Sequence, residues 1–474
     1  MRKDLGLLGK EAVVYGLSTV VARLLNFLLL PFYTHYLAPG EYGAVSTAYS
    51  YLAFLNIFLL LGLDQAYLRF ATGADDARAE ASFSTAFWSL AAWGAVAAGS
   101  LAFFATPLAA AGGISVAAGT VGRCMAAIVL LDSLAAPAFA ELRLRHRAWA
   151  YAGIKSFNIV LSVVLNIAFV GGLKLGVRGV FLAGVASSAA SLALLAPVIA
   201  SRLRGRFERP LAEAMFRFGL PLVPAGLGAM MVQVIDRPIL LKLTDSATVG
   251  IYQANYRMGI FMMLLVSTFD QAWRPFYLER AEKPETPALL ARVLTLSVAG
   301  MAWTALALSL FIPDLVRFEL LGRPLIHRAY WEGLGVVPIV LFAYVFHGAY
   351  INFLAPVTIA KQTASVAAVT ALGAFVNVAA NFLLIPRFGM VGAAWATLVA
   401  YAAMAWQMHF FARRAWPVPY EWGTLGAALL PVAAAGTVAL GLEGRLEPGN
   451  WLALRLALVL AVPVAWLPLL RKQL

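Results

Sequence analysis

Several charged side chains of this sequence stand inside long apolar runs. Arg23, Arg123 and Arg257 each lie in a run that is otherwise nearly free of charge. A charge in such a run costs several kcal/mol to remove from water, so it generally faces a cavity or a partner. A guanidinium group stays protonated and binds phosphate through two parallel hydrogen bonds. The three arginines, with Asn26 on the same helical face as Arg23, therefore predict a site for an anion, and a diphosphate fits this chemistry.

Acidic side chains within the apolar runs are fewer. Asp132 lies in the same run as Arg123, but nine residues separate them and place them on opposite faces of one helix. Asp236 and Arg237 are adjacent in another run. We interpret Asp132, Asp236 and Arg237 as coupling or gating residues. For Asp236, an ion pair with an arginine of another helix is the alternative.

Two further sets of polar residues have simpler explanations. Lys155, Asn158, Ser162 and Asn166 form a stripe at helical spacing, which we interpret as hydrogen-bonding groups between helices. Arg455 is expected to extend along its helix toward lipid headgroups. We find no acid–base pair or metal-ligand cluster in the sequence, so neither catalytic residues nor a metal site are predicted.

The elements that hold these residues follow from the composition of the 474-residue chain. Hydrophobic residues make up 62% of it and charged residues 12%, which is about half the charged share of soluble domains. Continuous apolar runs, rather than alternating ones, predict helices that cross a bilayer. We predict about fourteen spans, at 11–31, 43–63, 83–104, 117–140, 153–173, 178–200, 215–241, 248–269, 290–312, 333–356, 363–385, 390–411, 422–441 and 451–470.

Basic residues predict the orientation of these spans. Most of the 36 lysines and arginines fall on one side when both termini are placed in the cytoplasm. The net charge of +13 then reflects membrane topology, and no nucleic-acid partner is expected. The first apolar run lacks a small-residue cleavage site, so we interpret it as an uncleaved span.

The chain also repeats itself at an offset of 207 residues. The matched residues are Pro31, Gly43 and Tyr49 with Pro238, Gly250 and Tyr256. A second match joins residues 176–180 to residues 389–393. The repeat predicts an N-lobe at 1–212 and a C-lobe at 213–414, each of six helices. A pseudo-twofold axis along the membrane normal relates them. Residues 415–474 then form two further C-terminal helices.

Several segments resemble a known family. Residues 33–43 (YTHYLAPGEYG), the pair at 236–237 followed by residues 249–252, the segment 142–152 and residues 381–394 are similar to bacterial polysaccharide flippases. These flippases belong to the multidrug/oligosaccharidyl-lipid/polysaccharide (MOP) exporter superfamily. The resemblance covers nearly the whole chain and implies an all-α, MATE-like integral membrane protein of the bacterial inner membrane, not an enzyme.

The resemblance also implies an activity. Such proteins move undecaprenyl-diphosphate-linked oligosaccharides, such as O-antigen or capsule repeat units, from the cytoplasmic to the periplasmic leaflet by alternating access. Arg23, Arg123 and Arg257 would bind the diphosphate. No cofactor is expected, and coupling to protons, sodium ions or the membrane potential stays open. The partners implied are the lipid-linked oligosaccharide and membrane lipids, with a polymerase or glycosyltransferases as further candidates, and the chain would function as a monomer.

Three other classes compete with this interpretation. A lipid II flippase has the same number of spans, but the proline-glutamate-tyrosine-glycine signature favours the polysaccharide branch. A multidrug exporter carries cations, for which acids rather than arginines would dominate the cavity. A membrane glycosyltransferase or polymerase commonly has a large outer loop, and the loops predicted here are short.

Overall fold

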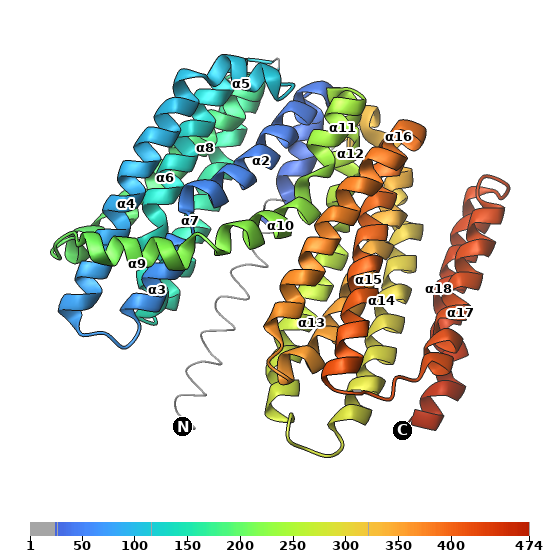
Figure 1. Cartoon of the computed structure of the whole chain (residues 1–474). Coiled ribbons are helices and arrows are strands. Elements are labelled where there is room, and N and C mark those ends of the chain that lie inside the picture. The colour runs from blue at the N-terminus through green and yellow to red at the C-terminus, as the bar shows by residue number, and fades with distance from the viewer. Residues whose placement is uncertain (1–23, 26, 115, 321, 474) are drawn as a thin grey trace. The chain divides into compact units, whose positions relative to one another are not determined.

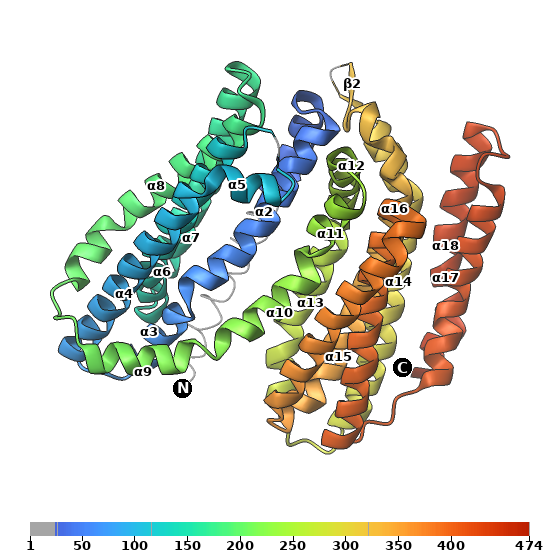
Figure 2. The ribbon, with the colours of Figure 1, turned by 45° about the horizontal axis from the view of Figure 1, so that its top comes forward.

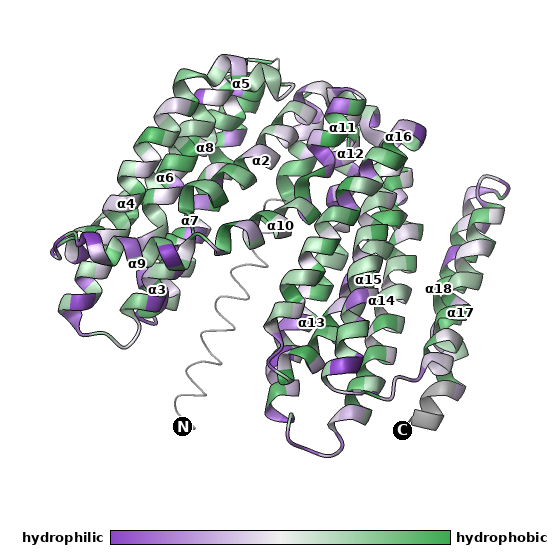
Figure 3. Ribbon diagram, viewed as in Figure 1, coloured by the Kyte–Doolittle hydropathy of each residue, from purple (hydrophilic) through white to green (hydrophobic). Residues whose placement is uncertain are grey.

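The structure, a computed structural model, describes residues 24–25, 27–114, 116–320 and 322–473. These residues are almost entirely helical, apart from the short antiparallel pair β1 (Glu319–Leu320) and β2 (Arg323–Pro324) (Figure 1). In the described chain, 11 helices are long and apolar enough to cross a membrane. Figure 3 shows hydrophobic residues along the helices and many hydrophilic ones at helix ends and in connections. The protein is therefore an all-α, multi-pass membrane protein, as predicted.

The structure divides into two compact units, residues up to Gln253 and residues from Ala254. The first holds α2 (Pro39–Leu60), α3 (Leu63–Ala71), α4 (Asp76–Phe103), α5 (Ala105–Ala111), α6 (Ala118–Leu144), α7 (Ala148–Asn166), the π-helical turn η1 (Ile167–Gly172), α8 (Gly176–Arg202), α9 (Arg209–Gly219), α10 (Leu222–Val234), α11 (Asp236–Leu243) and most of α12 (Ser246–Tyr256). The second holds η2 (Arg257–Gly259), α13 (Ile260–Glu279), α14 (Thr286–Arg317), β1, β2, η3 (Arg328–Gly335), α15 (Val336–Ile359), α16 (Thr363–Ala415), α17 (Trp422–Leu442) and α18 (Pro448–Gln473).

The predicted number of fourteen spans is not confirmed. The span at 11–31 lies largely outside the described residues. The spans at 363–385 and 390–411 join in α16, where Gly389 has φ 54° and ψ −133°. The spans at 215–241 and 248–269 are each divided among separate helices. Pro221 stands at the break between α9 and α10, where a residue without an N–H donor ends regular helical bonding.

In the first unit, α4, α6, α7 and α8 form a bundle with α2 beside it (Figure 2). Large side chains fill its centre, and Tyr67, Phe83 and Leu90 are fully buried. At one end, α9 packs across α3 and α4. The carboxylate of Asp75 caps α4 by accepting a hydrogen bond of 2.8 Å from the Arg78 backbone N–H, which satisfies one of the free donors of the first turn.

In the second unit, α13 and α16 pack on α15, and α17 and α18 form a pair against α14. Arg455 of α18 is only 6% exposed. It donates to the Asp314 carboxylate at 2.5 Å and to the Leu310 carbonyl at 2.7 Å, both on α14. The expectation that Arg455 reaches lipid headgroups was therefore wrong. Asp314 had been assigned to a loop, but α14 extends to Arg317 and brings this acid into reach.

Two repeat-related glycines mark the closest approach between α2 and α12. A Cβ on Gly43 would lie 1.8 Å from the Ser246 carbonyl oxygen, and one on Gly250 would lie 2.0 Å from the Pro39 carbonyl oxygen. At the offset of 207 residues, Gly43 corresponds to Gly250 and Pro39 to Ser246. The same contact is thus made twice with the roles exchanged, as a twofold axis requires. The Ser246 hydroxyl also donates to the Gly40 carbonyl at 2.6 Å.

A second pair of matched glycines supports the repeat. Gly176 begins α8 with φ 56°, and Gly389 bends α16 with φ 54°. Both lie in the left-handed region that glycine adopts without steric cost. Gly392, three residues after Gly389, approaches Leu384 so closely that a Cβ would lie 2.4 Å from its carbonyl oxygen. The two halves therefore repeat a local backbone feature, whereas the predicted lobe boundaries stay a prediction.

Substituting alanine for Gly43 or Gly250 is expected to destabilise the protein by at least about 1–3 kcal/mol, because the added methyl meets backbone that cannot rotate away. The measurement is the thermal unfolding midpoint of the purified full chain at a fixed heating rate. Gly40→Ala is the matched control, since a Cβ there has nothing within 4 Å. Equal midpoints for Gly43→Ala and Gly40→Ala would contradict the close contact.

Candidate functional site

The four predicted anion-binding residues are not brought together within one unit. Arg23 and Asn26 lie outside the described residues. Arg123 lies in α6 of the first unit, and Arg257 lies in η2 of the second. The cationic site that they would form therefore stays a prediction, but the surroundings of Arg123 and Arg257 are visible.

Arg123 is exposed, whereas its neighbours Gly122 and Cys124 are buried. Gly122 explains this arrangement, because a Cβ there would lie 2.9 Å from the Cβ and the carbonyl oxygen of Ala105 in α5. One face of α6 thus packs tightly on α5. The adjacent residue Arg123 is turned to an open surface, where a guanidinium group is accessible to a ligand.

Arg257 is half-buried at a break in the helical path. The 3-10 turn Arg257–Gly259 separates α12 from α13, although the sequence predicts one continuous span there. Gly259 lets the turn approach α15, since a Cβ would lie 2.7 Å from Val340 and 3.1 Å from Tyr344. A short 3-10 segment inside a helix often marks a functional hinge, so the setting of Arg257 is compatible with its predicted role.

Asp132 belongs to a polar centre between four helices of the first unit. Its carboxylate lies near the side chains of Ser188 of α8, Asn56 of α2 and Lys155 of α7 and interacts electrostatically with them. The Lys155 ammonium also lies 4.1 Å from the ring centre of Phe139. Asp132 is thus oriented by neighbouring helices, as expected from its separation from Arg123 along α6. Its predicted part in coupling is untested by this geometry.

The polar stripe of α7 links helices, as predicted. The Asn158 amide donates to the Ser187 carbonyl at 2.9 Å and to the Ser191 hydroxyl at 2.7 Å, both on α8. The Asn166 side-chain oxygen accepts a hydrogen bond of 2.8 Å from the Tyr33 hydroxyl. These bonds satisfy polar groups that would be costly to leave unpaired among apolar helices.

Asp236 and Arg237 form a closed network in the first unit. They are 2% and 6% exposed, and Nη1 of Arg237 lies 2.9 Å from Oδ1 of Asp236. The Arg237 Nε donates to Gln253 at 2.8 Å, and its Nη1 donates to the Gln233 carbonyl. The Tyr252 hydroxyl donates to Oδ2 of Asp236 at 2.5 Å. Asp236 therefore pairs with its chain neighbour, and the alternative of an arginine from another helix was wrong. The coupling or gating role stays a prediction.

Sequence reasoning missed an ion pair of the second unit, and it placed His347 beside Tyr344 and Tyr350 but missed its neighbour Tyr401. Asp270 and Arg274 form an ion pair of 3.0 Å on α13, and their spacing of four residues was an available signal. The His347 ring stacks on Tyr350 with ring centres 5.8 Å apart and lies 4.9 Å from that of Tyr401. This aromatic setting, built from α15 and α16, required knowledge of which helices adjoin.

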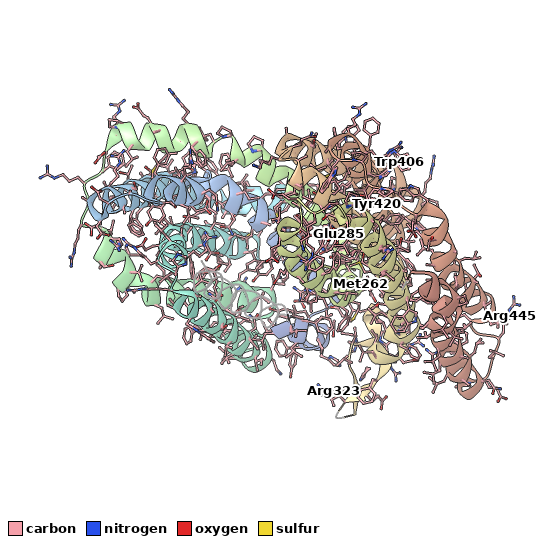
Figure 4. The ribbon with its side chains drawn as sticks, turned by 90° about the horizontal axis from the view of Figure 1, so that it is seen from below. Met262, Glu285, Arg323, Trp406, Tyr420 and Arg445 are labelled. Carbon is pink, nitrogen blue, oxygen red and sulfur yellow. The ribbon has the colours of Figure 1, made fainter. Side chains whose placement is uncertain are left out.

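An apolar cavity of about 590 Å³ opens between α14, α15, α16 and α17. Phe353, His409, Tyr420 and Trp422 cluster beside it, with the rings of Phe353 and His409 4.9 Å apart and those of His409 and Trp422 5.0 Å apart. Figure 4 labels Tyr420, which lies beside the cavity, and Trp406, which lines it. Apolar walls of this kind suit a hydrocarbon chain. The sequence did not reveal the cavity, because it forms only where α17 packs against α14.

Residues 34–310 match the model of a family described as "Polysaccharide biosynthesis protein". The chain belongs to this family. No match was found among curated protein sequences.

Solved structures of transporters have the same fold as this family member. A lipid II flippase MurJ in an inward closed conformation matches with a TM-score of 0.77 and 13% identity, over 97% of this chain and 99% of that one. An inward-facing multidrug resistance MATE transporter of the MOP superfamily matches with a TM-score of 0.63 and 13% identity, over 83% and 97% of the two chains. A Vibrio cholerae MATE transporter gives 0.60 and 14%, over 88% and 98%. The family match confirms the predicted polysaccharide family, and the likeness to these structures confirms the predicted fold.

Neutralising one partner of the buried pair should be costly. Asp236→Asn leaves Arg237 without its carboxylate, so we expect a loss of about 3–5 kcal/mol in stability. The double variant Asp236→Asn/Arg237→Gln should recover much of that loss, since no charge remains buried. The measurement is thermal unfolding of the purified variants.

The exposed pair Arg209–Glu213 is the control for this experiment, with side chains 85% and 69% exposed. Glu213→Gln should cost less than about 1 kcal/mol. A double variant no more stable than Asp236→Asn alone would argue against a charge-compensated network.

Proposed function

We propose that this protein is a flippase for undecaprenyl-diphosphate-linked oligosaccharide, the O-antigen, capsule or exopolysaccharide repeat unit. It moves this cargo from the cytoplasmic to the periplasmic leaflet of the bacterial inner membrane by alternating access. The match of residues 34–310 to the polysaccharide biosynthesis family carries this proposal. A family that serves polysaccharide synthesis with a transporter fold requires a cargo that must cross the membrane.

The apolar cavity supports a cargo with a lipid part. Its walls come from α14 to α17, and hydrophobic side chains make up most of them. Relative to water, burying a polyprenyl chain there gains about 0.8 kcal/mol for each methylene. The lipid phase gives the chain nearly the same gain, so moving it from lipid into the cavity changes the free energy little. The cavity therefore serves to position the chain rather than to supply affinity.

The arginines supply the complementary part of the site. In this proposal Arg23, Arg123 and Arg257 bind the diphosphate, and Asn26 hydrogen-bonds beside Arg23. Guanidinium groups pair with phosphate oxygens in a two-pronged geometry. Outward movement of a net anion from a negative cytoplasm is favoured by about 2.3 kcal/mol per charge at 100 mV. Asp132, Asp236 and Arg237 then govern coupling or gating.

Lobes at 1–212 and 213–414 moving about their pseudo-twofold axis provide the alternating access, with both termini in the cytoplasm. The exchanged glycine contacts of Gly43 and Gly250 support such an axis. A single chain with two repeats is complete as a monomer. A polysaccharide polymerase or a glycosyltransferase would act on the same lipid-linked cargo and is the natural partner.

Lipid II, the cargo of MurJ, is the second candidate. The observation in its favour is the TM-score of 0.77 over 97% of this chain. At 13% identity this likeness concerns the fold, whereas the family match concerns polysaccharide synthesis. We therefore rank lipid II second.

Transport in liposomes tests the proposed arginine site. A fluorescent undecaprenyl-diphosphate-oligosaccharide is reconstituted with the protein, and its protection from an external probe is measured with and without an imposed potential. Arg23→Ala, Arg123→Ala and Arg257→Ala should each slow flipping by about tenfold or more, since a charge-assisted hydrogen bond is lost. Arg445→Ala, in the exposed turn between α17 and α18 (Figure 4), is the control.

Undiminished transport by all three arginine variants would reject the cationic site but keep the function. Transport of lipid II and not of any oligosaccharide by the folded wild type would favour the second candidate.

Filling the apolar cavity tests the position of the lipid chain. Ala433 of α17 lines the cavity, and its neighbour Ala434 does not, although both are exposed. Ala433→Phe is expected to slow flipping of the polyprenyl-linked cargo severalfold, because the ring occupies space needed by the chain. Ala434→Phe adds the same ring outside and should flip at the wild-type rate in the same assay. Equal rates for both variants would place the lipid chain elsewhere.

A further inference from the structure

A polar pocket of about 490 Å³ lies where α6 and α8 end, within the first compact unit. Arg145, Arg147, Ser201 and Arg202 line it, and Glu141 is the one acidic side chain in its wall. Three guanidinium groups thus surround a cavity with a single carboxylate. Such a surplus of fixed donors is suited to an anion. None of the residues assigned above to the transported cargo lines this pocket.

Glu141 holds two of the arginines in place. It is 3% exposed, and its Oε1 lies 2.6 Å from Nε of Arg202 and 3.2 Å from Nε of Arg145. Its other oxygen accepts a hydrogen bond from the Tyr67 hydroxyl. The carboxylate is thus fully engaged within the protein. A guanidinium group has five N–H donors, so both arginines keep donors beyond the Nε that binds Glu141.

Acids outside the pocket use part of this remaining capacity. Arg145 donates through Nη2 to Asp76 at 2.7 Å. Nη1 of Arg202 lies 3.7 Å from Asp76 and 3.6 Å from Glu80, longer than hydrogen bonds. These acids orient the two guanidinium groups from behind but do not line the cavity. The arrangement is therefore fixed before a ligand arrives, which lowers the entropic cost of binding.

Arg147 differs from the other two arginines. It is exposed, and within the described part of the chain its side chain has neither an ion pair nor a hydrogen bond. The turn between α6 and α7 sets its place. His146 adopts a left-handed conformation with φ 55°, and the Arg147 backbone N–H donates to the Leu142 carbonyl at 2.9 Å. A tight turn thus holds an uncompensated charge at the pocket wall.

The surroundings of the pocket favour a ligand with an apolar part. α6 and α8 are apolar enough to cross a membrane and end at the pocket, so it lies at the depth of lipid headgroups. Pro197 and Val198 of α8 form an apolar border beside the arginines. Basic pockets between helices at this depth are suited to acidic lipid headgroups. We propose that the pocket binds the phosphate of an anionic lipid headgroup, with Arg147 as the principal docking cation.

Two sources could supply this phosphate, a phospholipid of the surrounding leaflet or the diphosphate head of a lipid-linked molecule. Both present the same oxygen atoms to the arginines. The inference does not rest on the proposed transport function, because it concerns equilibrium binding in a pocket that none of the predicted cargo arginines among the described residues lines.

Ligand binding to the purified full-length chain in a neutral detergent tests the proposal. Native mass spectrometry would count retained phosphatidylglycerol, with phosphatidylcholine as the zwitterionic headgroup of zero net charge and inorganic pyrophosphate as the lipid-free probe. Arg147→Gln should weaken binding of phosphatidylglycerol by about tenfold or more. Because the Arg147 side chain has no partner among the described residues, the variant should unfold at the wild-type midpoint.

Two matched variants complete the experiment. Arg204→Gln removes one charge from an exposed arginine that does not line the pocket and should bind like the wild type. Val198→Phe keeps every charge but fills the pocket and should weaken binding as Arg147→Gln does.

The outcomes separate the two sources and the alternatives. Phosphatidylglycerol binding lost in Arg147→Gln and Val198→Phe but kept in Arg204→Gln supports a phospholipid headgroup. The same pattern with pyrophosphate supports the phosphate pocket and assigns it to a diphosphate head. If Arg147→Gln and Arg204→Gln weaken binding equally, the loss of net charge alone explains the effect, and the proposal is overturned. Binding unaffected by Arg147→Gln would overturn it as well. Neither result depends on flipping, so failure here leaves the transport proposal standing.

Discussion

The crossing of α2 and α12 at Gly43 and Gly250 is the constraint on which the arrangement of the first unit depends. Backbone meets backbone there, with carbonyl oxygens where side chains would otherwise stand, so only glycine permits this distance. The contact occurs twice with the roles of the two repeats exchanged. Shortly beyond it the chain leaves regular α-helical geometry at Arg257–Gly259.

Polar groups in the apolar parts of this protein fall into two kinds. Asp236 with Arg237 is a buried ion pair, and Arg455 is a buried arginine paired with the half-exposed carboxylate of Asp314. The charges in each pair cancel, and removing one partner of the buried pair would be costly. Arg123 is exposed instead, which makes it available to bind. The distinction separates structural ion pairs from candidate binding groups, and it could not be made from residue type alone.

Hydropathy was sufficient to predict the class of fold and the position of most helices, because the cost of burying polar backbone in lipid leaves few alternatives. It did not predict where spans are broken, since a 3-10 turn at Arg257 depends on close packing of Gly259 against α15. The partner of Arg455 was missed because α14 continues past the predicted end of its span. The apolar cavity arises from the packing of α17 on α14, which a periodic pattern does not encode. The resemblance recognised in short motifs was confirmed by the family match.

The bend at Gly389 has a mechanical consequence. A straight helix of the 53 residues of α16 would extend about 80 Å, far beyond a bilayer core of about 30 Å, so two crossings are joined with one glycine as their bend. No loop separates the two crossings, because the helical segments meet at Gly389. The two crossings that meet at Gly389 are therefore held together at that end and cannot separate there. A longer connection would let the two crossings of α16 lie farther apart at this end. A similarly short connection occurs at Gly176, where α8 begins directly after the turn that follows α7 and η1.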